Sequence, residues 1–399
     1  MRRLPRGALF AAAVLALATA CGSKSTPPAT TTTAAAAPAH WTITDLGTLG
    51  PTYTTSIASA IDEQGEVVGG SGTANGTQHG FLWRDGKMTD LGTLGGRDSG
   101  AAAINEHGQI IGASLTAKPA RTHGFVWQNG KMTDLGTLGG RSSRPRAIND
   151  KGQIVGESLT ASGETHPFLW QNGKMTDLGT LGGPLGYALA INASGQVVGE
   201  SKTAGGRFHG FLWQNGKMTD LGTLGPTYTD SSAVAINDRG QVVGTSYTGV
   251  VTQNGQQGHA FLWQKGKMTD LGTLGSAYPA SDGVAIDASG AVVGSNLGTA
   301  GTRQPVLWRN GKIMDLGSLG GTFGATVAID DRGQVIGVSI PASGNSVHAF
   351  VWQNGKLTDL GTLGGAESDP SAINEQNQIV GLATTAAGKG HAVLWTLKA

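Results

Sequence analysis

Histidine is the side chain with the clearest chemical potential in this sequence, and its placement is regular. Seven of the nine histidines occupy one position of a recurring phrase, namely His79, His123, His166, His209, His259, His348 and His391. A metal site would need several imidazoles to converge on one point. Equivalent positions of a repeat lie one unit apart, so we expect each histidine to make a structural hydrogen bond with the aspartate of a neighbouring D-L-G phrase. No metal site is predicted from them.

Acidic residues recur in turns of the type D-x-x-G or N-x-x-G, as at Asp330-Asp331. A hard cation needs six or more oxygen ligands, and each turn offers one or two side chains. Turn capping is therefore the expected role, with calcium binding as the less favoured alternative. Glu367 and Asp369 form the only close acidic pair in a variable loop. A glycosidase could use such a pair, although a solvated loop is the commoner meaning.

Sequence motifs of the common catalytic families are missing from the chain. We find no nucleophile elbow, P-loop, H-E-x-x-H or dinucleotide fingerprint. No catalytic residue and no cofactor are predicted.

The histidines and acids belong to eight copies of a repeat of about 44 residues. The copies are marked by D-L-G-[TS]-L-G phrases that begin at Asp45, Asp90, Asp134, Asp177, Asp220, Asp270, Asp315 and Asp359. Each copy is predicted to form four short strands, a to d, which in one copy span 101–105, 109–114, 123–128 and 131–135. Asn129-Gly130 joins the last two of these strands, and Asn-Gly is the strongest short-range signal of a tight hairpin.

The pattern of the strands favours a β-propeller. Strand c carries consecutive apolar residues, such as Phe211-Leu212-Trp213, so both of its faces must be buried, as in a sheet stacked between two others. The body begins with a strand d alone (41–46) and ends with a strand c that lacks its d (391–395). Pairing the two ends would close a ring and remove two exposed edges. We therefore predict an all-β fold: a single eight-bladed β-propeller of four-stranded blades, closed by the N-terminal strand. A β-helix remains the alternative.

The recurring H-[AG]-F-[LV]-W phrase, seen at His79, His123, His209, His259 and His348, resembles the motif of the HAF-repeat family of extracellular bacterial proteins. The resemblance covers essentially all of residues 41–399. It implies export and carries no assigned activity. One copy departs from the motif, with Gln304-Pro305-Val306-Leu307-Trp308.

The start of the chain is typical of an export signal. Basic residues precede an apolar stretch, residues 7–20, that is too short to span a bilayer stably. Ala18-Thr19-Ala20-Cys21 then resembles the lipobox of bacterial lipoproteins, and Cys21 is the only cysteine. The resemblance implies a signal peptide over 1–20 and lipidation at Cys21. An ordinary signal peptide is the alternative. Residues 21–40 are predicted to be a flexible tether and residues 41–399 the propeller.

Composition and charge narrow the range of partners. The formal net charge is +1 and there is no basic run, so nucleic acid is not an expected partner. The expected partners are the membrane, through the lipid anchor, and an extracellular glycan or protein. We expect a monomer on the outer surface of the cell membrane.

The segments between strands d and a vary most among the copies, and variable loops on a rigid scaffold commonly carry function. Four of the five tyrosines fall in these segments, together with a phenylalanine and several arginines. The predicted ligand-binding residues are Tyr53, Tyr187, Tyr228, Tyr278, Phe323, Arg97 and Arg144. The expected function is a non-enzymatic binding or scaffold lipoprotein that uses the face formed by the d–a and b–c loops. The alternatives are an extracellular enzyme acting on a polymer such as a glycan, and an adhesion protein.

Overall fold

The computed structural model describes residues 40–398 except 52–54, 253–254, 299–300, 343 and 345. Every regular element in the described part of the chain is a β-strand. None of these residues forms a long apolar helix that could cross a membrane. The predicted signal peptide, Cys21 and the tether up to residue 39 lie outside the described residues, as does Tyr53. The first strand begins at His40, one residue before the predicted boundary.

The strands follow one another in the predicted order a, b, c, d. Strand a of the repeats is β2 (Ser56–Ile61), β6 (Gly95–Ile104), β10 (Gly139–Ile148), β14 (Gly182–Ile191), β18 (Asp230–Ile236), β22 (Ala280–Ile286), β26 (Gly320–Ile329) and β30 (Gly364–Ile373). Strand b is β3 (Val67–Gly72), β7 (Ile110–Thr116), β11 (Ile154–Thr160), β15 (Val197–Thr203), β19 (Val242–Thr252), β23 (Val292–Leu297), β27 (Val335–Pro341) and β31 (Gln378–Thr385). Strand c is β4 (Gln78–Arg84), β8 (Thr122–Gln128), β12 (Thr165–Gln171), β16 (Phe208–Gln214), β20 (Gly255–Gln264), β24 (Arg303–Arg309), β28 (His348–Gln353) and β32 (Gly390–Lys398). Strand d is β5 (Lys87–Asp90), β9 (Lys131–Gly136), β13 (Lys174–Asp177), β17 (Lys217–Asp220), β21 (Lys267–Asp270), β25 (Lys312–Asp315), β29 (Lys356–Asp359) and β1 (His40–Gly47).

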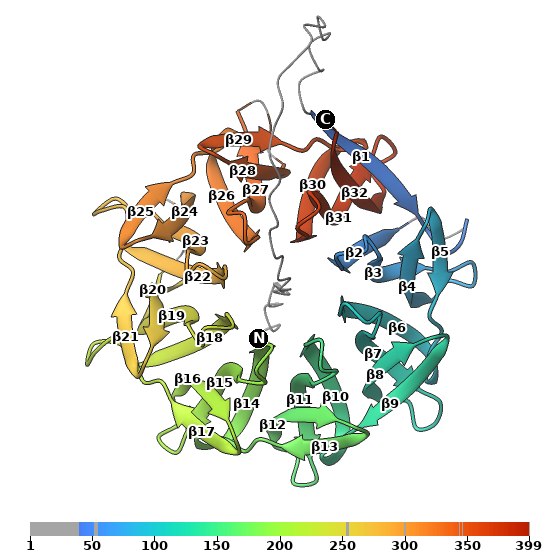
Figure 1. Ribbon diagram of the computed structural model, residues 1–399, viewed down its shortest axis with the longest axis horizontal. Helices are drawn as coiled ribbons and strands as arrows, with labels where there is room; N and C mark the ends of the chain where they lie inside the picture. The colour runs from blue at the N-terminus through green and yellow to red at the C-terminus, as the bar shows by residue number, and fades with distance from the viewer. Residues whose placement is uncertain are drawn as a thin grey trace, which may run out of the picture.

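The four-stranded units surround a central axis, with strand a innermost and strand d outermost (Figure 1). We number them in chain order: repeat 1 is β2–β5, repeat 7 is β26–β29, and repeat 8 combines β30–β32 with β1. The N-terminal strand β1 pairs antiparallel with β32, from His40 opposite Lys398 to Gly47 opposite Ala392. The two ends of the described chain therefore complete one sheet, as the sequence predicted.

The tight turns form where the sequence places them. Asn or Asp adopts a positive φ at the c–d turn, as at Asn129 (φ 51°), and glycine follows it, as at Gly130 (φ 82°). Two consecutive positive φ angles define the type I′ hairpin, which only such residues adopt at low cost. Lys265 adopts the same conformation in the one copy that lacks Asn or Asp (φ 50°).

The apolar core lies between neighbouring repeats. Consecutive residues of strand c point to opposite sides: Phe211 packs with Val155 of the preceding repeat, and Leu212 packs with Phe261 of the following one. Burial of such a side chain contributes roughly 1.5–3 kcal/mol. One cluster joins Leu46 and Leu394 of repeat 8 to Phe81 of repeat 1, so the described core also spans the two ends of the chain.

Hydrogen bonding groups the described strands into six sheets rather than eight. Two sheets contain eight strands each because a single parallel pair joins neighbouring repeats. These pairs are Thr165 with Leu185, between β12 and β14, and Arg303 with Phe323, between β24 and β26.

The two fused junctions differ from the six others in the residues of strands c and a that meet there. At the six other junctions a serine of strand a accepts a hydrogen bond from the backbone N–H of the preceding strand c, as Ser99 does from Gly80 at 3.0 Å. At the fused junctions strand c carries Pro167 or Pro305, which has no N–H, and strand a carries Gly186 or Gly324. A Cβ on either glycine would lie 2.8 Å from the proline Cδ. Proline and glycine therefore replace the serine linkage as a pair.

Strand a extends further than predicted in five repeats. The strand expected to begin at Ala101 begins at Gly95, and β10, β14, β26 and β30 are ten residues long in the same way. Much of what the sequence suggested to be variable d–a loop is therefore the first half of the innermost strand. Only the longer segments before β2, β18 and β22 remain loops or turns.

Candidate functional site

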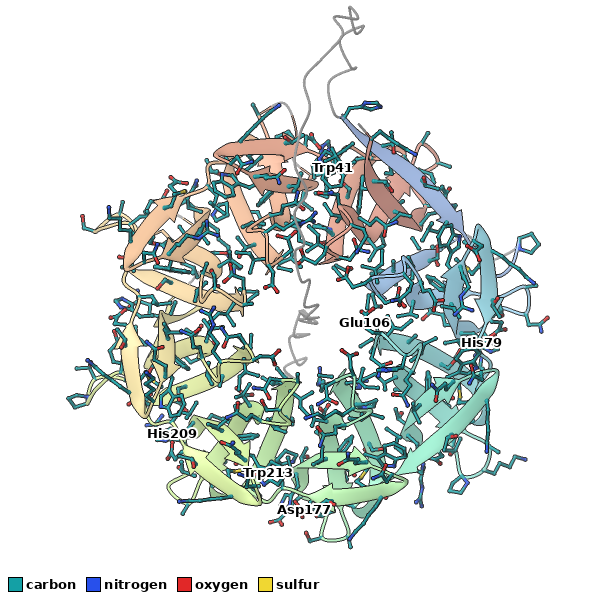
Figure 2. All side chains as sticks on the ribbon, in the orientation of Figure 1. Trp41, His79, Glu106, Asp177, His209 and Trp213 are labelled. Atoms are coloured by element: carbon teal, nitrogen blue, oxygen red, sulfur yellow. The ribbon has the colours of Figure 1, made fainter. Side chains whose placement is uncertain are left out.

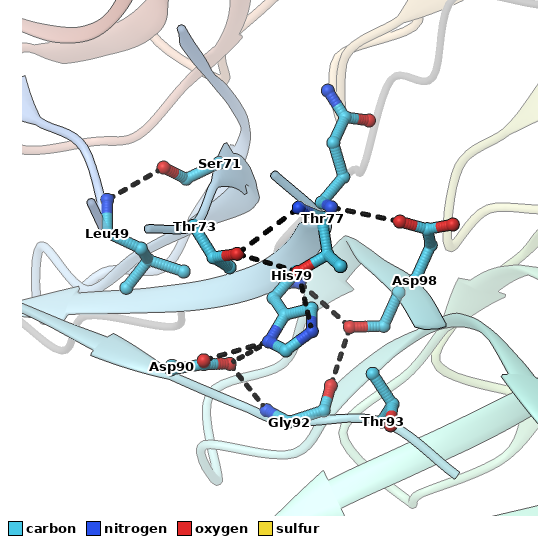
Figure 3. A network of polar contacts seen from close by, with 12 residues as sticks. Leu49, Ser71, Thr73, Thr77, His79, Asp90, Gly92, Thr93 and Asp98 are labelled. Atoms are coloured by element: carbon cyan, nitrogen blue, oxygen red, sulfur yellow. Dashed lines mark hydrogen bonds and ion pairs between the residues drawn. The ribbon is translucent and has the colours of Figure 1, made fainter. Parts of the chain in front are cut away.

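The recurring histidines are structural, as the sequence predicted. The Nδ1 atom of each lies 2.7–2.9 Å from the D-L-G aspartate on strand d of its own repeat. Figure 3 shows His79 with Asp90, and Asp90 also accepts the backbone N–H of Gly92 at 2.7 Å. In the one copy that lacks this histidine, Gln304 Nε2 donates to Asp315 at 2.6 Å in its place. These pairs lie toward the outside of the ring, where Figure 2 labels His79, His209 and Asp177.

Four of the predicted ligand-binding residues lie on strands of four different repeats. Arg97 (β6), Arg144 (β10), Tyr187 (β14) and Phe323 (β26) lie on strand a rather than in loops. Arg97 is exposed and donates to the carbonyl oxygen of Gly76 at 2.7 Å. Of the other three predicted residues, Tyr53 is not described, and Tyr228 and Tyr278 lie in the turns before β18 and β22.

The described tyrosines are half-buried and packed. Tyr187 stacks on Phe208 with ring centroids 6.4 Å apart, and burial raises its pKa. Tyr228 packs edge-on against the ring of His259 at 5.9 Å. The hydrogen bond to Asp270 raises the pKa of His259, and Tyr228 packs on this hydrogen-bonded pair of its own repeat. The fifth tyrosine, Tyr247, lies among buried polar groups, and burial raises its pKa to about 12.

The innermost strands enclose a channel along the axis, a pocket that is partly open to solvent. Its wall comes from the ends of all eight strands a and the a–b turns that follow them. In every repeat the pairing of strands a and b shifts register at the same place, as between Ala188 and Ala190. The shift leaves one unpaired residue per repeat, and a β-bulge of this kind re-aims a side chain. Five of these residues line the channel: Ser59, Ala102, Arg146, Leu189 and Ser371.

Carboxylates surround the a–b turn end of the channel, one residue after the Asn or Asp that begins each turn. They are Glu63, Glu106, Asp150, Asp238, Asp331 and Glu375. Glu106 faces the centre of the ring in Figure 2. Carboxylate oxygens of all six accept the backbone N–H of the equivalent residue in the preceding repeat, as Glu63 accepts that of Glu375 at 3.1 Å.

Three neighbouring glutamates of this set have raised pKa values: Glu375 of repeat 8, Glu63 of repeat 1 and Glu106 of repeat 2. Burial, followed by the charges of Glu106 and Glu375, raises the pKa of Glu63 to about 7. Burial likewise raises the pKa of Glu106 and of Glu375. Among the described residues, no group of three or more His, Cys, Asp or Glu side chains has the geometry to hold a metal ion.

Sequence reasoning missed both the bulge residues and the carboxylate ring. A signal for the ring was present, because the position after the turn-initiating Asn or Asp is acidic in six of eight copies. The bulges carry no signal in one sequence, since they change pairing without changing the hydrophobic pattern.

No protein-family model and no curated protein match this chain. Among solved structures it is similar to Porphyromonas gingivalis dipeptidyl peptidase 4, with 11% identity, a TM-score of 0.56, and coverage of 88% of this chain and 58% of that one. It is also similar to the Pyrococcus horikoshii acylaminoacyl peptidase (11% identity, TM-score 0.48, 74% and 51% covered) and to TolB from Acinetobacter baumannii (12%, 0.35, 73% and 81%).

The chain thus spans little more than half the length of the two peptidase structures. At these identities the likeness concerns the fold alone. Together with the all-β architecture, it supports a β-propeller fold.

Proposed function

We propose that the protein is a single eight-bladed β-propeller, closed by β1, that acts as a non-enzymatic binding or scaffold lipoprotein on the cell surface. Eight four-stranded units and the pairing of β1 with β32 support the closed ring. The fused junctions reduce the number of sheets without removing a unit.

One observation carries the binding function: a β-bulge at the same register position in all eight repeats. The bulges recur on a constant framework, and in five of the eight repeats the bulge residue, which differs between repeats, lines the shared channel. The exposed Arg144 and half-buried Tyr187 lie on the same innermost strands, two residues before the bulge. We therefore propose that the ligand, an extracellular glycan or protein, binds along the axis in the channel that these bulge residues line.

Binding of the purified full chain to a glycan and peptide array would test this proposal. The paired substitutions Leu189→Ser and Ser371→Leu change the channel wall, and we expect them to weaken binding at least tenfold. Tyr278→Ala, in a turn before β22, is the matched control and should leave binding unchanged. If Tyr278→Ala alone abolishes binding, the ligand lies over the outer loops instead.

An extracellular enzyme acting on a polymer such as a glycan is the second candidate. The specific observation in its favour is the set of three adjacent glutamates with raised pKa values at the channel mouth, since perturbed carboxyl groups cluster at catalytic sites. The test is whether the purified chain cleaves a polysaccharide, as a hydrolase or a lyase would. Cleavage that is lost in the Glu63→Gln variant would replace the binding proposal with this one.

Location on the cell surface depends on Cys21. With serine at this position the sulfur that would carry the lipid is missing, so the protein should leave the membrane fraction or accumulate as the precursor. Fractionation and mass spectrometry of the N-terminus measure this. A Cys21→Ser protein that still fractionates as a diacylated membrane protein would refute the anchor.

A further inference from the structure

Adjacent repeats are tied together at the a–b turns by one recurring contact. The Nδ2 atom of the turn-initiating asparagine donates to the backbone carbonyl oxygen of the equivalent residue in the next repeat. Asn105 does this to Asn149 at 3.0 Å, and Asn149, Asn192, Asn237 and Asn374 do the same. The bond from Asn374 reaches Asp62 O at 2.9 Å and ties repeat 8 to repeat 1.

The same Nδ2 atom also holds a glutamine of its own repeat. In repeat 2, Asn105 Nδ2 donates to Gln109 Oε1 at 2.8 Å. Each linkage therefore places one N–H donor group between two oxygen acceptors, one from each repeat.

Three repeats carry aspartate in place of this asparagine, and two of them supply an arginine. In repeat 7, Arg332 Nη2 donates to Asp330 Oδ2 at 2.8 Å, to Gln334 Oε1 at 3.1 Å and to the carbonyl oxygen of Asn374 at 3.2 Å. The last two are the acceptors to which the asparagine Nδ2 donates in other repeats. In repeat 6, Arg309 Nη2 lies 3.8 Å from Asp287 Oδ2.

Repeat 1 has the aspartate, but its arginine, Arg84, pairs with Glu66 instead. Asp62 is 1% exposed, and its Oδ1 accepts the backbone N–H groups of Gln64 and Glu66. Its Oδ2 is buried and has no hydrogen-bond partner among the described residues. The glutamine is also replaced, by Glu66, whose carboxylate pairs with Arg84. In five other repeats the atom at this position is an amide nitrogen that donates to the carbonyl oxygen of the next repeat, which here is Asn105. Repeat 1 therefore places an oxygen where those repeats place a donor.

We propose that Asp62 is a proton-binding site, whose carboxylic acid O–H takes the place of the asparagine N–H and links repeat 1 to repeat 2. The protonated acid is close in shape to asparagine and donates one hydrogen bond across the junction. When Asp62 loses this proton, its buried Oδ2 has no hydrogen to donate to the neighbouring oxygen acceptors, which weakens the junction. The inference is independent of what the channel binds.

The carboxylates around Asp62 favour its protonated form, whereas the Arg84 cation favours the carboxylate. Glu66 and Arg84 face it from its own repeat, Glu106 faces it from repeat 2, and Glu63 with Glu375 lies on the side of repeat 8. Burial, followed by the charges of Glu66 and Glu106, raises the pKa of Asp62 to about 6. An acid with a raised pKa in the folded state stabilises the fold below its ordinary pKa near 4. That contribution is lost as the pH rises from about 4 through 6.

Thermal unfolding of the full chain between pH 4.5 and 8 tests the proposal. The wild-type midpoint should fall by a few degrees relative to Asp62→Asn, which supplies the amide that other repeats use. Taking the difference between the two proteins cancels the titration of Glu63, Glu106 and Glu375. Asn105→Asp is the matched converse, since it places an acid without an arginine in repeat 2. The unfolding midpoint of this variant should gain a pH dependence of the same sign. Carboxyl NMR of aspartate-labelled protein should show a resonance that titrates near pH 6 and is missing in Asp62→Asn.

Two results would overturn the proposal. If the pH profiles of wild type and Asp62→Asn run parallel, Asp62 does not exchange its proton in this range. If calcium at pH 8 raises the midpoint of the wild type but not of Asp62→Asn, the oxygens at this junction bind a metal ion rather than a proton.

Discussion

At the scale of single residues, the His–Asp pairs show how a repeated polar contact tolerates substitution. His209 contacts Asp220 through Nδ1 at 2.9 Å, and the aspartate side chain is 41% exposed. A contact of this exposure is worth little, because water competes with both partners. Gln304 makes the equivalent bond in repeat 6, so the position needs a donor rather than an imidazole.

This reasoning predicts different outcomes for two substitutions of one residue. His209→Ala should lower the free energy of unfolding by about 0.5–1 kcal/mol, since the donor and its packing are both lost. His209→Gln should lose less, because it restores the donor that repeat 6 uses. Urea denaturation of the two variants measures the difference, and equal losses would show that the ring rather than the hydrogen bond matters.

The sequence was sufficient to predict these pairs because the aspartate recurs at a fixed position in all eight copies and the histidine in seven of them. It was not sufficient for the predicted binding residues, because their role depends on what they contact. Tyr228 was predicted to bind ligand, yet its ring packs on His259 of the same repeat. Asp62 illustrates the same limit, since only comparison with Arg332 in three dimensions shows that it lacks a donor.

At the scale of elements, the order and identity of the strands were predictable because turn residues and alternating apolar positions are local signals. The extension of strand a was not, because its first residues are glycine-rich and pair only at isolated points, as Gly95 does with Thr116. The fusion of sheets was also not predictable, because it depends on two residues far apart in sequence, Pro167 and Gly186, that meet at a junction.

That junction gives an element-scale prediction. Pro167→Gly alone should destabilise the protein by roughly 1–3 kcal/mol, because it adds a buried N–H that has no serine to accept it. Gly186→Ser alone should also destabilise it, because its Cβ would lie 2.8 Å from Pro167 Cδ. Together the two changes recreate the serine linkage of the other six junctions, so the double variant should recover most of the loss.

A double-mutant cycle in guanidinium chloride measures this coupling. The cycle Gly80→Pro with Ser99→Gly, at a serine junction, is the matched converse and should show coupling of the same sign. Additive losses in both cycles would mean that proline and glycine are not exchanged as a pair.

At the scale of the whole molecule, stability depends on joining the two ends of the described chain. β1 supplies Leu46 to the apolar cluster between repeats 8 and 1, and Asp45 to the pair with His391. The sequence predicted this arrangement because an isolated strand d at the start and a missing strand d at the end are complementary. Among the described residues, β1 is the strand that pairs with the outer edge of β32.

Deletion of residues 41–46 should therefore open the ring at one place. The edge of β32 loses the backbone partners that run from Trp41 to Asp45, and an unpaired edge strand is a template for association. We expect a clear fall in the melting temperature and the appearance of oligomers, measured by calorimetry and by light scattering after size exclusion. Deletion of residues 24–29, six residues of the predicted tether, is the length-matched control and should change neither. A synthetic peptide spanning residues 40–47 should restore the melting temperature by adding the missing strand to the edge. If the shortened chain remains monomeric with an unchanged melting curve, the repeats hold together as an open array and β1 is dispensable.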